Sequence, residues 1–310
     1  MRPKVLGLVG PTASGKSALA LRAATDLGGE IVCMDSMQVY RMMDVGTAKP
    51  TLEEREAVPH HMLDVADPRD SYSVAQYAQD ARAAIDGILA RGRLPILCGG
   101  TGLYLRSLSY RMDFGRAPAD PAVRERYEAM ARERGAQAVH GELALRDPES
   151  AARLHPNDLR RVVRALEVFE LTGRPLSEDR LPDAADGPYV MRLFALSWPR
   201  ETLYARVEER ARAMAEGGLP EEVKALLDYG VPPDAQSMQG LGYKELVPYV
   251  RGETSLEDAL EQVMRRTRNY AKRQLTWFNA DPRIRWLEGD AGMETLLDGM
   301  KRGLDDGQAV

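Results

Sequence analysis

A glycine-rich segment near the start of the chain has the residue types and spacing that bind phosphate groups. It matches the pattern G-x-x-x-x-G-K-[ST]. In such a loop Gly10 and Gly15 let the backbone curl, so that successive N–H groups point at phosphate oxygens. Lys16 adds a positive charge, and the Ser17 hydroxyl can hold Mg²⁺. The motif predicts that a diphosphate-bearing ligand binds to Gly10, Pro11, Thr12, Ala13, Ser14, Gly15, Lys16 and Ser17.

A carboxylate follows the second apolar run of the chain. Residues 31–34 have strand character and lead into Asp35, whose side chain is expected at the carboxyl edge of a parallel sheet, beside the phosphate loop. Asp35 could take a proton as a general base, act as an outer Mg²⁺ ligand, or cap a helix. Gln38 could contact an adenine edge, although an isolated glutamine is more often polar surface.

A third apolar run leads into a segment with three glycines in four residues, Gly99-Gly100-Thr101-Gly102. This composition predicts close backbone approach, either to a ligand or to another segment of the chain. Thr101 would then face the same phosphates. The adjacent His60 and His61 lack metal-ligand spacing, so they are expected to be surface or turn residues without a chemical role.

Basic side chains cluster on one face of a predicted helix near the C-terminus. They are Arg265, Arg266, Arg268, Lys272 and Arg273. At about 100° per residue they occupy an arc of about 160°. The opposite, packing side carries Val263, Tyr270, Gln274 and Trp277. A predicted helix over 159–171 repeats the pattern with Arg160, Arg161 and Arg164. Each basic face could simply be solvated, but two of them near a phosphate site suggest an RNA backbone bound across a channel.

The elements that must position these groups alternate between strands and helices. Continuous apolar runs, typical of strands buried on both faces of a parallel sheet, occur at 5–9, 31–34, 94–98, 190–196 and 284–287. Helices are expected over 17–24, 72–91 and 200–216. The predicted fold class is α/β, with a P-loop NTPase-like parallel sheet flanked by helices.

One segment interrupts this alternation. Residues 118–188 are charged and helical, with no strand-like run, and predict an all-helical insertion domain. The catalytic core is then discontinuous and comprises residues 1–117 and 189–310.

Composition excludes several classes of protein. The chain has 310 residues with 44% hydrophobic and 29% charged, as expected of a soluble globular protein. Its net charge of −5 excludes a histone-like role. Cys33 and Cys98 are the only cysteines and lie in apolar runs, which argues against a disulfide framework or structural zinc. No run approaches the roughly 20 apolar residues of a membrane span. We expect a cytoplasmic monomer.

Taken together, these motifs resemble the tRNA dimethylallyltransferases, also called tRNA isopentenyltransferases, of the bacterial type without a zinc finger. The matching blocks are residues 10–17, 35–41, 43–50, 59–64, 72–74, 99–104, 155–158, 164–168, 240–245 and 272–278. The most specific feature is Asp-Ser-x-Gln-Val-Tyr at 35–40 followed by Gly-Thr-Ala-Lys-Pro at 46–50. Two departures are Ser17, where many members have Thr, and Asn279, where an arginine is common; the latter puts one phosphate contact in doubt.

The resemblance implies transfer of a dimethylallyl group from dimethylallyl diphosphate to N6 of the adenosine just 3′ of the tRNA anticodon, with release of diphosphate and help from Mg²⁺. It implies that Asp35 accepts the N6 proton, and that Thr101 contacts diphosphate or helps to place the amine. Lys16 and Arg210 would bind the diphosphate. The implied tRNA contacts, chiefly to the anticodon stem-loop, are Asp35, Ser36, Met37, Gln38, Thr101, Arg124, Arg160, Arg161, Arg164, Gln239, Gly240, Tyr243, Lys244, Arg268, Lys272, Arg273 and Gln274.

Two other functions are compatible with the residues alone. A small-molecule or nucleotide kinase would use the same phosphate loop, an aspartate after the second strand, and a helical lid. A nucleotide-gated RNA-binding protein without catalytic activity would also use the loop and the basic helices. Retention of Asp35 and Thr101 beside the loop argues against the second alternative.

Overall fold

The computed structural model describes residues 2–110, 119–178 and 187–305. The chain forms two compact units, one comprising Met1–Ser109 with Gly187–Val310 and the other Tyr110–Asp186. The predicted domain boundary between 117 and 118 lies outside the described residues. The chain re-enters the first unit at Gly187, two residues before the position expected from the sequence.

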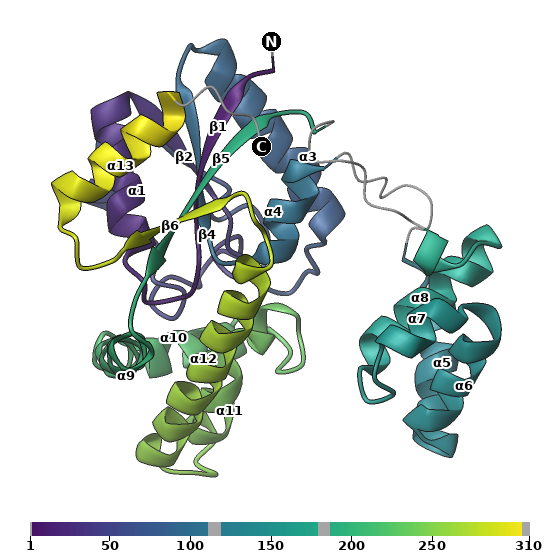
Figure 1. The fold of residues 1–310 in the computed structure, drawn as a ribbon. Helices are drawn as coiled ribbons and strands as arrows, with labels where there is room; N and C mark the ends of the chain where they lie inside the picture. Colours follow the sequence, from purple (N-terminus) through teal and green to yellow (C-terminus); the bar gives the residue numbers. More distant parts are fainter. Residues whose placement is uncertain (1, 111–118, 179–186, 306–310) are drawn as a thin grey trace. The chain divides into compact units, whose positions relative to one another are not determined.

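The first unit is built on a six-stranded parallel sheet with the strand order β3-β2-β4-β1-β5-β6 (Figure 1). Its strands are β1 (Lys4–Val9), β2 (Gly29–Cys33), β3 (His60–His61), β4 (Leu94–Gly99), β5 (Val190–Ser197) and β6 (Ile284–Glu288). All five apolar runs form strands, because helices bury their side chains on both faces. The predicted fold class is confirmed.

The expectation that His60 and His61 lie at the surface or in a turn is wrong, because they form a half-buried edge strand. Both residues are half-buried and pair in parallel with Ile31 and Val32 at the edge of the sheet. His61 Nε2 lies 2.7 Å from a carboxylate oxygen of Glu30. A two-residue strand held by its neighbour's backbone has no apolar run that the sequence could reveal.

Helices cover the two faces of the sheet with separate apolar cores. On one face, α1 (Lys16–Leu27) and α13 (Met293–Asp305) bury residues such as Leu19 and Leu297. On the other face, α3 (Val74–Ala90) and α4 (Gly102–Ser109) bury tyrosine and aliphatic side chains. Figure 1 shows the two pairs on opposite sides of the strands.

Four helices lie beyond the carboxyl ends of the strands, in the lower part of the first unit in Figure 1. They are α9 (Arg200–Glu216), α10 (Leu219–Asp228), α11 (Tyr243–Val250) and α12 (Leu256–Asn279). α12 packs against both α9 and α11. Two short elements, α2 (Leu52–Ala57) and η3 (Ser237–Gln239), complete this unit.

The described part of the second unit, residues 119–178, is entirely helical. Its elements are α5 (Pro121–Arg134), α6 (Ala136–Arg146), α7 (Pro148–Arg153), α8 (Leu159–Thr172) and the short η1 (Leu176–Glu178). They enclose their own apolar core, which includes Tyr127, Leu143 and Leu166. Over the described ranges of the whole chain, no helix is both long and apolar enough to cross a membrane.

Candidate active site

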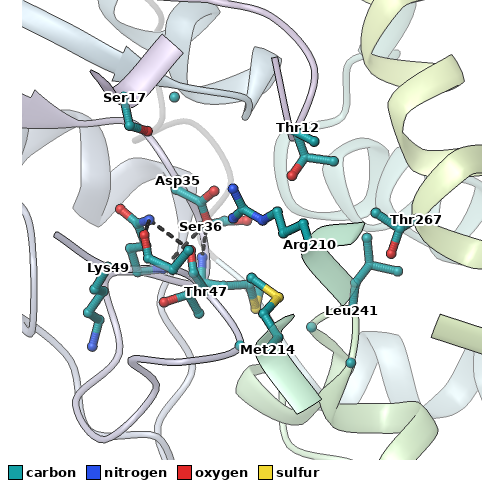
Figure 2. A pocket seen from close by; sticks show the side chains of 18 of the residues that line it. Thr12, Ser17, Asp35, Ser36, Thr47, Lys49, Arg210, Met214, Leu241 and Thr267 are labelled. Atoms are coloured by element: carbon teal, nitrogen blue, oxygen red, sulfur yellow. Dashed lines mark hydrogen bonds between the residues drawn. The ribbon is translucent and has the colours of Figure 1, made fainter. Parts of the chain in front are cut away.

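A cavity of about 570 Å³ lies at the carboxyl edge of the sheet, within the first unit. Figure 2 shows side chains from the phosphate loop, from the segment after β2 and from α9 and α12 around it. The predicted site residues that line it are Thr12, Ala13, Lys16, Ser17, Asp35, Ser36, Met37, Gln38, Arg210, Gln239, Gly240, Tyr243, Arg273 and Gln274.

The phosphate loop has the backbone that its sequence requires. Gly10 and Gly15 have φ angles of 126° and 93°, a region that a side chain rarely permits. α1 begins at Lys16, so its N-terminal N–H groups face the loop. The Ser14 hydroxyl is fully buried and has no hydrogen-bond partner among the described residues. A loop with open N–H groups and an unsatisfied hydroxyl fits an oxyanion ligand.

Side chains from distant parts of the chain hold this loop in place. The bonds are Thr12 N–H to Gln274 Oε1 (2.9 Å), Trp198 Nε1–H to Ser14 O (2.9 Å) and Arg206 Nε–H to Ala13 O (2.8 Å). The Arg206 guanidinium also stacks over the Trp198 ring at 4.6 Å. The phosphate loop is therefore pre-organised by α9, α12 and the end of β5.

Two cations face the cavity without a carboxylate partner. Lys16 Nζ donates only to the Pro11 carbonyl, at 3.2 Å, and Arg210 forms no ion pair with any described residue. Burial lowers the pKa of Lys16, and the nearby Arg210 lowers it further. Burial also lowers the pKa of Arg210, which the charge of Asp35 opposes. Partly desolvated cations without counter-ions indicate an anion-binding site.

Asp35 stabilises the turn of residues 36–39; no helix begins there, so the helix-capping role left open by the sequence is not observed. Its Oδ1 accepts the N–H groups of Met37 (2.9 Å) and Gln38 (3.4 Å). No donor within the described ranges is bonded to Oδ2, and Asp35 and Arg210 are labelled together at the centre of Figure 2. One oxygen thus holds the turn while the other remains available to accept a proton or bind a metal ion.

The three glycines of residues 99–102 approach other segments of the chain. A Cβ atom at Gly99 would lie 2.0 Å from Met34 O, at Gly100 2.2 Å from Gln274 Nε2, and at Gly102 2.4 Å from the Trp277 ring. The sequence left a ligand or a chain segment as alternatives, and the structure selects the chain segment. These contacts place α12 directly against the start of α4.

The Tyr270 side chain meets Thr101 at the edge of the cavity. Thr101 does not line the cavity; its Oγ1 accepts the Ser36 N–H at 3.1 Å. The Tyr270 hydroxyl lies against the Thr101 and Gln274 side chains, and burial with the nearby Asp35 charge raises the pKa of Tyr270 to about 12. Tyr270 lines the cavity, although its helical position predicted only packing. The packing side of α12 is therefore the side that faces the site.

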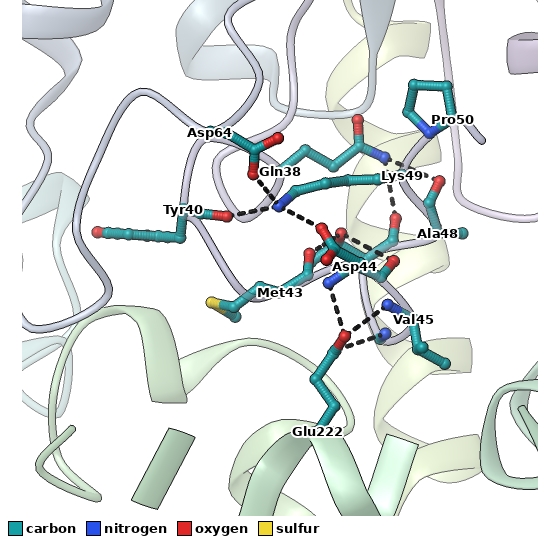
Figure 3. Close-up of polar contacts among 12 residues, drawn as sticks. Gln38, Tyr40, Met43, Asp44, Val45, Ala48, Lys49, Pro50, Asp64 and Glu222 are labelled. Atoms are coloured by element: carbon teal, nitrogen blue, oxygen red, sulfur yellow. Dashed lines mark hydrogen bonds and ion pairs between the residues drawn. The ribbon is translucent and has the colours of Figure 1, made fainter. Parts of the chain in front are cut away.

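The loop of residues 43–50 forms one wall of the cavity and is anchored by Glu222 on α10 (Figure 3). The Glu222 carboxylate accepts backbone N–H groups from Asp44 (2.7 Å), Val45 (2.7 Å) and Gly46 (3.0 Å). It also accepts the Tyr243 hydroxyl at 2.5 Å. Sequence reasoning missed Glu222, because an acidic residue on a surface helix carries no signal of such a partner.

Buried polar contacts fix the rest of this loop. Lys49 is enclosed, and its ammonium binds the Tyr40 carbonyl (2.6 Å), Asp64 (2.6 Å) and Asp44 (2.8 Å), as Figure 3 shows. Gln38 Nε2 donates to the Thr47 carbonyl at 2.9 Å. These bonds explain the presence of Lys49 and Gln38, because both side chains stabilise the conformation of the loop beside Asp35.

The other predicted tRNA contacts fall outside the cavity. On α12, Lys272 is exposed, whereas Arg268 pairs with Glu208. Lys244 donates to Gln239 Oε1 at 2.9 Å. Gln274, in contrast, lines the cavity but is buried, and its amide accepts the Thr12 N–H and donates to the Gly100 carbonyl.

In the second unit, two of the predicted arginines share a buried carboxylate partner. Arg124 and Arg164 both bind the buried Glu167 carboxylate, which ties α5 to α8. Arg160 and Arg161 are exposed, and Arg161 lies 3.4 Å from Asp158. The exposed pair keeps its charge available to a ligand, while the paired residues hold the helices together.

The donor set beside the phosphate loop fits Mg²⁺. The Ser17 hydroxyl and the Asp35 carboxylate are hard oxygen donors that line the same cavity. In the described ranges, no group of three or more His, Cys, Asp or Glu residues could hold a metal ion by itself. Mg²⁺ commonly binds one or two protein oxygens and takes its other ligands from substrate phosphates and water.

Fold and site together define a phosphate-loop α/β protein with an anion-binding cavity and an adjacent carboxylate. The chain matches the family model described as IPP transferase over residues 38–281, and the model described as Isopentenyl transferase over residues 3–70. The chain belongs to the IPP transferase family.

Individual relatives agree over nearly the full chain. The tRNA dimethylallyltransferase of Geobacillus thermodenitrificans is 47% identical over 93% of this chain and 91% of the relative. That of Geobacter sulfurreducens is 48% identical over 95% of each chain. The crystal structure of tRNA isopentenylpyrophosphate transferase from Bacillus halodurans superposes with a TM-score of 0.73 at 41% identity, covering 98% of this chain and 97% of that one. A eukaryotic dimethylallyltransferase acting on tRNA gives a TM-score of 0.78 at 30% identity, over 93% and 74%.

Proposed function

We propose that this protein transfers a dimethylallyl group from dimethylallyl diphosphate to N6 of the adenosine on the 3′ side of the tRNA anticodon. The observation that carries the proposal is the pair of cations Lys16 and Arg210, which have no carboxylate partner among the described residues and share one cavity with Asp35. Membership of the IPP transferase family supports the chemistry. The site offers an anion cradle for the leaving group and a base for the nucleophile.

The leaving group is stabilised first by the protein itself. Breaking the allylic C–O bond places negative charge on diphosphate. The loop N–H groups, the Lys16 ammonium and the Arg210 guanidinium are positioned before the reaction to receive that charge. When bound, Mg²⁺ would neutralise part of the same charge, with Ser17 as its protein ligand.

The nucleophile needs a base, because the exocyclic amine of adenine is weakly nucleophilic. Asp35 accepts the N6 proton through the carboxylate oxygen that the Met37 and Gln38 N–H groups leave open. Thr101 fixes Ser36 next to it and is a positioning residue, acting through that backbone contact. The target base is splayed out of its loop to reach the cavity, at modest energetic cost in a single strand.

The tRNA is held by basic and polar surfaces of both units. In the first unit, these are the cavity rim at 239–243 and the exposed cations of α12, including Lys272. In the second unit, Arg160 and Arg161 are the exposed cations of α8. Phosphate contacts of this kind position an RNA without reading its sequence.

The kinase alternative lacks support from the comparisons, since the matching relatives are named tRNA dimethylallyltransferases. A direct assay separates the two activities. Purified protein, Mg²⁺ and unmodified tRNA are incubated with labelled dimethylallyl diphosphate or with γ-labelled ATP, and the nucleosides are analysed. We expect label from the prenyl donor on adenosine N6. Label passing from ATP to a small acceptor, with none on tRNA, would refute the proposal.

A further inference from the structure

Two cysteine side chains lie next to each other in the floor of the active-site cavity. Cys33 ends β2, and Cys98 is its register partner on the neighbouring strand β4. Adjacent strands are about 4.7–4.9 Å apart, which lies within the Cα separation of about 4.4–6.8 Å that a disulfide spans. Register partners on parallel strands project from the same face of the sheet, and both residues line the cavity.

Each thiol has a partner that belongs to the active site. The Cys33 S–H donates to Gln38 Oε1 at 2.9 Å, and the Ser17 side chain lies beside Cys98. Both thiols are free and buried from bulk solvent, so the cavity is their route to small reagents.

We propose that Cys33 and Cys98 form a reversible oxidation site that switches the enzyme off. Hydrogen peroxide oxidises one thiol to a sulfenic acid and releases water. The second thiol attacks that sulfur and the S–S bond forms. The hydroxyl group leaves with the proton of the second thiol as a second water molecule. The two sulfur atoms give up two electrons to the peroxide, and a thiol reductant reverses the reaction.

The effect on activity rests on the proposed function. Closing the disulfide removes the S–H donor to Gln38, whose amide holds the loop at Thr47. It also removes the contact of Cys98 with Ser17, at the start of α1. Displacement of catalytic groups by about 1 Å can cost about 100-fold in rate. A bound diphosphate covers the loop above the two thiols and would shield them from peroxide.

The site is tested by mass spectrometry, without reference to activity. Reduced protein is treated with hydrogen peroxide, with and without inorganic diphosphate and Mg²⁺. We expect the intact mass to fall by about 2 Da as two hydrogens are lost, a linked peptide that contains both cysteines, and slower formation when diphosphate is present. Cys33→Ser keeps a hydroxyl donor for Gln38, and Cys98→Ser is the complementary variant. In either one, a stable +16 Da or mixed-disulfide product replaces the linked peptide.

Transferase activity is then compared for each protein before and after oxidation, against its own reduced form. The rate of wild type should fall by about 10-fold to 100-fold after oxidation and recover fully with dithiothreitol. The two serine variants cannot form the disulfide, so oxidation should change their rates little. Absence of the linked peptide in wild type overturns the proposal, even if the enzyme transfers dimethylallyl groups as expected. A linked peptide in a protein with no transferase activity would instead refute the proposed function and leave the oxidation site standing.

Discussion

At the scale of single residues, a carboxylate and two cations share one water-accessible cavity but do not neutralise each other. Asp35 is held by its own turn, whereas Lys16 and Arg210 lack carboxylate partners in the described part of the chain. This separation lets the cations bind a diphosphate while the carboxylate serves the amine. It also assigns the two half-reactions, loss of diphosphate and loss of a proton, to different side chains.

The role of Asp35 as a base is tested by Asp35→Asn. The amide keeps an oxygen for the Met37 N–H, so the turn should persist, but it cannot take the N6 proton. We expect a fall of about 10²- to 10⁴-fold in the single-turnover rate, with unchanged affinity for tRNA and for diphosphate. Asp228→Asn, an exposed substitution on α10, is the matched control. A near-normal rate in Asp35→Asn would exclude this base.

The lowered pKa of Lys16 predicts a pH dependence of diphosphate binding. Binding requires the ammonium form, so affinity is constant while Lys16 is charged in the free protein and decreases as pH rises through its pKa. Because burial lowers that pKa, the decrease should begin below the ordinary lysine value of 10.5. Lys16→Arg keeps the charge and should remove this part of the profile. The dissociation constant of inorganic diphosphate between pH 7 and 10 provides the measurement; superimposable profiles would contradict the assignment.

At the scale of elements, the helix α12 connects the phosphate loop to the glycine-rich segment after β4. Its Gln274 bonds to both Thr12 and Gly100, and its Trp277 packs on Gly102. Its outer face carries the exposed cations predicted from the sequence. One helix therefore connects diphosphate binding to an RNA-facing surface, which explains the position of its polar and aromatic residues.

The loop of residues 43–50 depends on α10 through one carboxylate. Glu222→Gln leaves a single acceptor oxygen for three N–H groups and a hydroxyl. We expect a loss of about 1–3 kcal/mol in the free energy of unfolding and a lower kcat/KM for tRNA, whereas diphosphate affinity should not change. The neighbouring, exposed Glu221→Gln provides the control. Equal loss of diphosphate affinity would show that Glu222 acts through general destabilisation and does not position this wall.

Most strands of the core could be predicted, because burial on both faces requires continuous apolar runs. The edge strand β3 could not, since it comprises only His60 and His61, paired with β2, and both side chains are polar. The helices α10 and α11 also gave no distinct signal in the sequence. The glycines at 99–102 indicated close approach but not its partner, because Met34, Gln274 and Trp277 come from other elements.

At the scale of the whole molecule, the net charge is −5, so binding of RNA depends on local clusters of basic side chains. The candidate site was predictable where a motif specifies both residue type and backbone shape, as at residues 10–17. Basic residues were less predictable, because a sequence shows that Arg124 and Arg164 are cations but not that they share the buried Glu167. Ion pairs between distant segments decide which cations remain for RNA.

The salt dependence of tRNA binding tests whether an exposed cation of α12 contacts RNA phosphates. Lys272→Gln should weaken tRNA binding and reduce the slope of log affinity against log salt by about one, because this side chain is exposed and near the cavity-lining residues of α12. Arg302→Gln, an equally exposed change on α13, should leave the slope unchanged. Identical slopes for both variants and wild type would remove α12 from the tRNA-binding surface.

The most direct test of the central claim uses two synthetic anticodon stem-loops that differ in one atom group. One has adenosine at the position 3′ of the anticodon, and the other has purine riboside, which lacks the exocyclic amine. With protein, Mg²⁺ and dimethylallyl diphosphate, we predict one dimethylallyl group on the first RNA, stoichiometric release of diphosphate, and no transfer to the second. Equal labelling of both RNAs, or labelling of neither, would contradict attack by N6 at this site.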